Sequence, residues 1–155
     1  MPRSLREEIL QGRPFVSREQ EAYLSVVRTA ALLSDSLERV LRPAGLSGPQ
    51  YNVLRILRGA GPQGLCRNDV RDRMLTRMPD MTRLLDRMEE AGLVVRARDA
   101  ADRRMVTTRI SPRGLELLQE LEDSIAAEHR RRLGHLGEER LARLIELLGE
   151  VREVT

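Results

Sequence analysis

The sequence predicts a mainly α fold with a small β-hairpin, an α+β arrangement, and two observations predict it. Apolar residues recur at intervals of three and four over most of the chain, the spacing that gives a helix one buried face. One region, residues 93–110, instead carries two β-favouring runs around a polar turn. The chain has 155 residues, 41% of them apolar and 33% charged. We therefore expect one domain that buries a core without disulfides.

Glycine and proline clusters divide the chain into its elements. Residues 1–16 form a charged N-terminal extension that ends near a Gly-Arg-Pro break. Ser17 is the expected N-cap of the first helix, with Gln20 completing a capping box. Helices are then expected at about residues 17–41, 49–59, 67–73, 76–91, 112–133 and 138–148, and strands at 93–98 and 105–110.

Three of the predicted helices have an apolar stripe that should face the interior. The expected inward residues are Tyr51, Leu54 and Leu57, then Met78, Met81, Leu85 and Met88, and then Leu115, Leu118, Leu121, Ile125 and Ala126. The first and last long helices also carry apolar stripes, which one chain is not expected to bury fully: Leu24, Val27, Ala31 and Val40, and Leu141, Leu144, Ile145 and Leu148.

The segment TRMPDMTRLLDRMEEAGL combines helical spacing with a proline and three arginines. Thr76 suits the N-cap, so Pro79 falls in the first turn, where backbone N–H groups have no partner within the helix. A helical wheel that starts there places Thr76, Asp80, Arg83 and Arg87 together, opposite the methionines and leucines. On the helix alone, this face is either solvated or in contact with a partner.

Charge is distributed unevenly along the chain. Residues 55–113 contain 14 arginines and eight acids, a balance of +6, whereas the rest of the chain has 13 arginines and 16 acids, a balance of −3. A basic middle between acidic ends is typical of a nucleic-acid-binding region. The chain has no tryptophan, two tyrosines and one phenylalanine, so it lacks the aromatic platforms on which single strands stack. Double-stranded DNA is therefore the expected partner.

A short helix, a tight turn, a second helix and a charged hairpin predict a winged helix-turn-helix. The second helix of this motif enters the major groove, and its first residues read base edges. Arginine there can bind guanine with two hydrogen bonds, and an arginine at the hairpin tip suits a narrow minor groove. The candidate DNA-binding residues are Thr76, Arg77, Pro79, Asp80, Thr82, Arg83, Arg87, Arg98, Asp102, Arg103 and Arg104. Asp102, which phosphates would repel, is expected to brace Arg104.

The chain resembles the MarR family of bacterial transcriptional regulators over residues 17–148. The resemblance rests on DAADRR at 99–104, followed by Ile110, Ser111 and Gly114, and on TRLLDRME at 82–89, followed by AGLV. It implies a winged helix-turn-helix lobe (residues 49–111) flanked by N- and C-terminal dimerisation helices (residues 17–48 and 112–155). It further implies a homodimer on a pseudo-palindromic operator, a repressor that is released by a small aromatic or lipophilic effector.

The resemblance places the effector cleft between the dimerisation helices and the DNA-binding lobe. The candidate ligand-binding residues are Tyr23, Arg28, Tyr51 and His129. Because the urate-responsive branch carries a pocket tryptophan, urate is not expected here. An alternative is a redox-responsive regulator that switches through Cys66, since a thiol at a helix N-terminus beside Arg67 favours the reactive thiolate. Redox-sensing members carry their cysteine nearer the N-terminus, and this chain has none there.

Other functional classes lack support in the sequence. One cysteine and two histidines give no metal-binding spacing, and we find neither a phosphate-binding glycine loop nor a nucleophile elbow. We expect no enzyme activity, no metal and no cofactor. No apolar run approaches the roughly 18 residues of a membrane span, and nothing resembles a signal peptide, so a cytoplasmic protein without membrane contact is expected. A helical interaction dimer with a solvated basic face remains the other interpretation.

Overall fold

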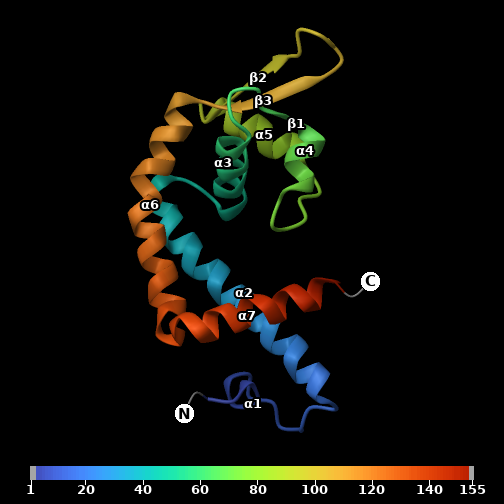
Figure 1. The fold of residues 1–155 in the computed structure, drawn as a ribbon, viewed down its shortest axis with the longest axis vertical. Coiled ribbons are helices and arrows are strands. Elements are labelled where there is room, and N and C mark those ends of the chain that lie inside the picture. The colour runs from blue at the N-terminus through green and yellow to red at the C-terminus, as the bar shows by residue number, and fades with distance from the viewer. Residues whose placement is uncertain (1–2, 154–155) are drawn as a thin grey trace. The chain divides into compact units, whose positions relative to one another are not determined.

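The helices and strands form largely where the sequence predicts them. The computed structural model describes residues 3–153, so residues 1–2 of the predicted extension and 154–155 of the predicted C-terminal region lie outside the described residues. The elements are α1 (Leu5–Glu8), α2 (Arg18–Leu41), η1 (Arg42–Ala44), α3 (Gly48–Ala60), β1 (Leu65–Cys66), α4 (Arg67–Asp72), α5 (Met81–Glu90), β2 (Val94–Arg98), β3 (Val106–Ile110), α6 (Pro112–Leu133), η2 (Gly134–Leu136) and α7 (Gly137–Glu153) (Figure 1).

The chain divides into two compact units, residues 1–36 and 37–155. The first holds α1 and most of α2. The predicted extension contains the short helix α1, which Ser4 and Glu7 cap reciprocally. Ser17 accepts a hydrogen bond from the backbone N–H of Gln20 at 3.2 Å, which confirms it as the cap of α2.

The second unit contains the apolar core, built from α3, α4, α5, α6, the sheet and the end of α2. Helix α3 packs against α6 and β3, and α5 packs against β2 (Figure 1). The buried apolar side chains are Leu41, Leu46, Val53, Leu54, Leu57, Val70, Met81, Leu85, Met88, Leu93, Val94, Leu117, Leu118, Leu121 and Ile125. This core supports the short α4 and α5 and the hairpin.

The sheet has a third strand that the sequence analysis missed. Its antiparallel order is β1-β3-β2, with Leu65 opposite Thr108 and Val94 opposite Ile110. Strand β1 has two residues, too few to show a period of two in the sequence. It anchors the segment before α4 to the hairpin.

Two expectations about helices were wrong. Helix α5 begins at Met81 with Asp80 as its N-cap, so Thr76 is not the cap and Pro79 lies outside the helix. Proline disfavours the helical conformation of the residue before it, and Asp80 caps the helix directly after it. In α6, Leu115 is 40% exposed while Leu117 is buried, because the inward stripe passes through positions 117, 118, 121 and 125.

The junction between the hairpin and α6 is closely packed. The buried Ser111 caps α6: its hydroxyl accepts from the backbone N–H of Gly114 at 3.0 Å and donates to the carbonyl of Gly92 at 2.6 Å. A Cβ on Gly114 would lie 2.5 Å from the carbonyl oxygen of Leu93 and 2.8 Å from Cγ1 of Ile110. Only glycine fits this contact between helix and strand.

We expect Gly114→Ala to destabilise the fold by about 1–3 kcal/mol, the usual cost of forcing extra atoms into a packed site. Alanine normally favours a helix over glycine by up to about 1 kcal/mol, so the sign of the change is informative. Gly59→Ala in α3 is the matched control, since nothing lies within 4 Å of its added Cβ. Urea unfolding of both variants measures the difference. Equal stability of the two would contradict the packing argument.

Helix α7 ends the described chain, and none of its residues is buried. Ile145 and Val151 are 67% and 65% exposed. Among residues 3–153, no helix combines the length and the apolar character that crossing a membrane requires.

Candidate DNA-binding surface

Helix α5 presents one face to the core and the other to solvent. Met81, Leu85 and Met88 are buried, as predicted, whereas Arg83 and Arg87 are exposed. Neither arginine side chain forms a hydrogen bond or ion pair with the part of the chain that the structure describes. The hydrophobic face fixes the helix, and the two guanidinium groups remain available to a partner outside the chain.

The turn before α5 carries the remaining predicted contacts of this region. The Asp80 carboxylate accepts from the backbone N–H of Arg83 at 3.0 Å. Thr76, Arg77 and Pro79 lie in the exposed turn and not on the helix, so the expected common face with Arg83 and Arg87 does not include Thr76.

A side chain of α3 holds this turn in place. The side-chain oxygen of Asn52 accepts from the backbone N–H of Leu75 at 2.8 Å. The two residues are 23 positions apart, so no local sequence pattern predicts this contact. It fixes where the turn enters α5.

Arg96 connects the hairpin to α5. Its guanidinium lies 2.5 Å from Oδ1 of Asp86 and 3.1 Å from Oε1 of Glu89, and its backbone N–H donates to the same Glu89 carboxylate at 3.0 Å. The Arg96 hydrogen bond lowers the pKa of Glu89. The two acids on the far side of α5 are thus used to hold strand β2. Arg96 is a positioning residue, and the sequence analysis missed it.

The hairpin tip, residues 99–104, is organised by aspartates. The backbone N–H groups of Ala101 and Asp102 donate to Oδ1 of Asp99 at 2.7 and 3.1 Å. The bonds from Asp102 and then Ala101 lower the pKa of the Asp99 carboxyl. A carboxyl whose pKa is depressed in the folded state stabilises the turn above its ordinary pKa and loses that effect as pH falls through the folded value. The contribution of the Asp99 carboxylate to the turn is therefore present at neutral pH.

Three hairpin arginines remain free for an external contact. Arg98, Arg103 and Arg104 are exposed, and their guanidinium groups have no hydrogen bond or ion pair within residues 3–153. The expected charge-assisted bond between Asp102 and the Arg104 guanidinium is not formed: the Asp102 carboxylate instead accepts from the backbone N–H of Arg104 at 3.0 Å. All N–H donors of the Arg104 guanidinium therefore remain available to a partner outside the chain.

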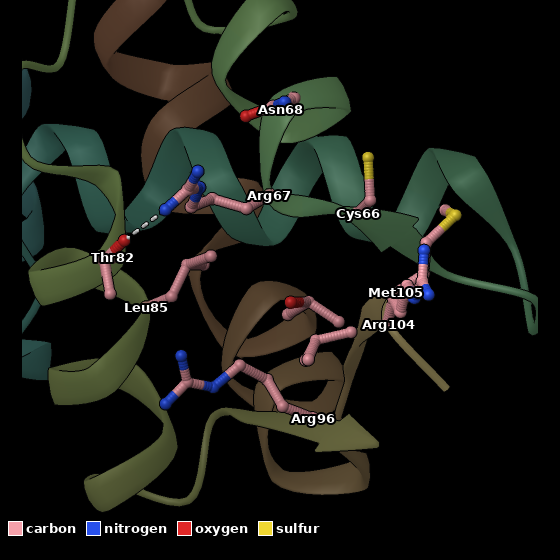
Figure 2. Close-up of a pocket in the computed structure, with 10 residues that line it drawn as sticks. Cys66, Arg67, Asn68, Thr82, Leu85, Arg96, Arg104 and Met105 are labelled. Carbon is pink, nitrogen blue, oxygen red and sulfur yellow. Dashed lines mark hydrogen bonds between the residues drawn. The ribbon is translucent and has the colours of Figure 1, made fainter. Parts of the chain in front are cut away.

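A hollow of about 500 Å³ lies between α4, α5 and the sheet. Figure 2 shows Arg67 extending from the start of α4 toward Thr82 on α5, with Arg96 and Arg104 on the sheet side. Arg67 was not among the predicted contacts. Arg67, Arg96 and Arg104 line the same hollow because β1 brings the start of α4 to the hairpin.

Cys66 lies at the edge of this hollow. It is the N-cap residue of α4, half-buried, and its Sγ donates to Oδ2 of Asp69 at 3.1 Å. Its predicted position at the start of this helix is confirmed. Its redox role stays a prediction.

The four effector candidates fall in different units. Tyr23 and Arg28 are exposed on α2 within residues 1–36. Tyr51 on α3 is half-buried, and the Arg55 guanidinium lies 5.9 Å from the centre of its ring. His129 on α6 is exposed. Each of the four residues is therefore described by itself, and its role in effector binding stays a prediction.

The arrangement is that of a winged helix-turn-helix: α4 and α5 joined by an anchored turn, and the β2–β3 hairpin held beside α5. Exposed arginines on α5 can form paired hydrogen bonds to base edges, and those at the hairpin tip can bind the backbone or the minor groove. The MarR family profile matches residues 44–105, which span α3 to the hairpin tip.

Known proteins are similar to this chain in both sequence and fold. The chain is 30% identical over 142 residues to the uncharacterized HTH-type transcriptional regulator YfiV of Bacillus subtilis (strain 168), covering 90% of this chain and 79% of that protein. It is 40% identical to a MarR transcription factor of Planctomyces limnophilus, whose crystal structure matches with a TM-score of 0.68 over 88% of this chain and 98% of that one. The structure of NadR in complex with 4-hydroxyphenylacetate matches at 24% identity and a TM-score of 0.72, over 92% and 100% of the two chains.

The expected fold and the absence of an enzymatic role are both in line with these relatives, which are regulators of transcription. The exposed arginines of α5 and of the hairpin tip are the candidate DNA-contacting groups of such a regulator. The chain belongs to the MarR family of DNA-binding transcriptional regulators.

Proposed function

We propose that the protein is a homodimeric repressor that binds a pseudo-palindromic operator and leaves it when a small aromatic or lipophilic molecule binds. The observation that carries the proposal is the exposed face of α5, where Arg83 and Arg87 have no partner among the described residues while the opposite face is buried. Such a face is suited to the major groove.

Exposed apolar side chains support the dimer. On α2, Tyr23 is 70% exposed and Val27 51%. On α7, Ile145 and Val151 are exposed to a similar degree. Both helices carry an apolar stripe that one chain leaves in water, and a large apolar patch of this kind marks an interface. A second copy of the chain would bury both stripes in a two-fold symmetric contact.

Dimer symmetry sets the form of the operator. Two copies of α5 related by a two-fold axis read half-sites about one DNA turn apart, roughly 34–36 Å. Arg83, Arg87 and Thr82 would face base edges, and the hairpin tip with Arg98, Arg103 and Arg104 would lie over the flanking minor groove. Bound across a promoter, such a dimer blocks transcription.

A small-molecule effector is supported by a structural relative. The matched NadR structure contains 4-hydroxyphenylacetate, a small aromatic acid. The half-buried Tyr51 and the exposed His129, Tyr23 and Arg28 are the residues of this chain that we assign to effector binding.

Selection from random duplexes with the purified full-length protein tests the function. The expected result is an inverted repeat with a spacing of about one turn, bound with an affinity that falls steeply with salt because counterions are released from the phosphates. Titration of aromatic acids into the complex then tests release. Recovery of unrelated sequences with equal affinity would favour the alternative of an interaction dimer with a solvated basic face.

Redox switching through Cys66 is the second candidate. The thiol lines the same hollow as Arg67 and Arg104 (Figure 2), so an oxidised sulfur would add a polar group beside the DNA-binding side chains. Peroxide should then abolish binding by the wild type and spare Cys66→Ser. Equal sensitivity of both proteins would remove this candidate.

A further inference from the structure

A hydrogen bond joins the two helices of the helix-turn-helix through their side chains. Nη1 of Arg67, the first residue of α4, lies 2.9 Å from Oγ1 of Thr82, in the first turn of α5 (Figure 2). The two residues are 15 positions apart and both are exposed. The contact does not serve the apolar core, which contains neither residue.

The direction of this hydrogen bond is fixed by chemistry. A guanidinium has five N–H donors and no acceptor, whereas a hydroxyl has one donor and two acceptor lone pairs. Thr82 must therefore accept from Arg67. The hydroxyl hydrogen of Thr82 cannot point at the guanidinium, so it is directed away from Arg67. The positive charge of the guanidinium also disfavours the approach of an amino donor to this hydroxyl.

The major-groove edge of DNA distinguishes bases by donors and acceptors. Guanine offers N7 and O6 as acceptors, thymine offers O4, and adenine offers N7 beside an amino donor, whereas cytosine offers only an amino donor. A threonine hydroxyl on its own can donate to the former or accept from the latter, so it discriminates poorly. With one lone pair occupied and a cation beside it, the same hydroxyl prefers an acceptor.

We propose that Arg67 is a specificity-determining residue: by binding Oγ1 of Thr82 it makes this hydroxyl a donor, so the base that Thr82 contacts must present an acceptor at its major-groove edge. The proposal rests on the proposed binding of α5 in the major groove. Arg67 acts through Thr82 and needs no base contact of its own.

Two substitutions isolate the effect. Arg67→Met removes the donors while keeping a long side chain, and Thr82→Val removes the hydroxyl while keeping the shape. Each should relax the preference for an acceptor at the same single position of each half-site by about 2- to 10-fold, the worth of one hydrogen bond. In Arg67→Met, the Thr82 hydroxyl is free to accept, so cytosine should gain most at that position.

The double variant distinguishes this mechanism from a phosphate contact by Arg67. If Arg67 acts through Thr82, the double variant should show the same base preference as Thr82→Val alone, since the two changes remove the same interaction. Arg67→Lys, which retains a cationic donor, should restore part of the preference. Arg71→Met is the matched control on α4: it also removes one positive charge, but among the described residues Arg71 pairs only with its neighbour Asp72.

The measurement is the affinity of each full-length variant for the selected operator and for its single-base substitutions, with unfolding midpoints to show that the fold is intact. A loss of affinity that is equal for all base pairs, or effects of the two variants that add, would overturn the proposal while leaving the DNA-binding function intact. If the wild type itself selects no preferred sequence, the proposed function fails first, and no base preference then exists for Arg67 to set.

Discussion

Arg83→Ala is expected to reduce operator selectivity at one position of each half-site. An arginine that binds guanine with two hydrogen bonds is worth about 1–3 kcal/mol against the wrong base, and a symmetric dimer contains two copies of it. Since Arg83 lies on the exposed face of α5 and has no partner among the described residues, its removal leaves the buried face of the helix and the fold unchanged.

Arg104→Ala is the informative comparison because it removes the same charge from the hairpin tip. That tip is held by backbone hydrogen bonds to Asp99 and Asp102, so the variant should lose an external contact and keep the tip's shape. We expect it to weaken binding nearly uniformly across sequences and to reduce the salt dependence by about two counterions per dimer, one for each copy of Arg104.

Fluorescence anisotropy with the selected operator and its single-base variants, at two salt concentrations, separates these outcomes. Arg83→Ala should flatten the affinity profile at one position per half-site, whereas Arg104→Ala should lower the whole profile. If both variants gave the same affinity profile as the wild type, α5 and the hairpin tip would not contact DNA, and the site assignment would be wrong.

The sequence predicts this surface well where the structure depends on residues that are close in the chain. The hydrophobic stripe of α5, the break at Gly92 and the polar turn between two β-favouring runs each follow from short-range spacing. The N-cap of α5 was placed four residues early, at Thr76, because Thr76 and Asp80 both suit an N-cap and a first-turn proline is tolerated. The structure shows that Asp80 is the cap.

The contacts that were missed are those that depend on tertiary packing. Asn52 binds the backbone of Leu75 across 23 residues, Arg96 reaches Asp86 across 10, and Arg67 reaches Thr82 across 15. At the sequence level Asp86 offers a partner to Arg83, since oppositely charged side chains three positions apart on a helix attract. In the structure Asp86 pairs with Arg96 instead, and Arg83 has no side-chain partner among the described residues.

The C-terminal helix gives the largest expected effect on assembly. Ile145 is 67% exposed on α7, and no residue of that helix is buried in the chain. Since the core of residues 37–155 contains no α7 side chain, Ile145→Glu should leave the DNA-binding lobe folded. In the proposed dimer it places two carboxylates in an apolar interface, where a disrupted central contact costs about 2 kcal/mol or more at each symmetry-related site.

The dimer dissociation constant of Ile145→Glu should therefore rise by roughly 100- to 1000-fold, as measured by sedimentation or light scattering over a dilution series. Arg143→Gln is the matched control. It shifts the charge by the same unit on the polar side of α7 and gives up only the exposed ion pair with Glu146 at 2.6 Å, which is worth about 1 kcal/mol or less.

Operator binding should fall together with dimerisation, because a monomer reads one half-site and forfeits the added affinity of the second. Binding to a duplex that carries a single half-site should be nearly unchanged, which separates loss of assembly from damage to the lobe. If Ile145→Glu remained dimeric at the same concentrations as Arg143→Gln, α7 would not form the interface. The exposed apolar residues of α2 would then have to supply it without the C-terminal helix.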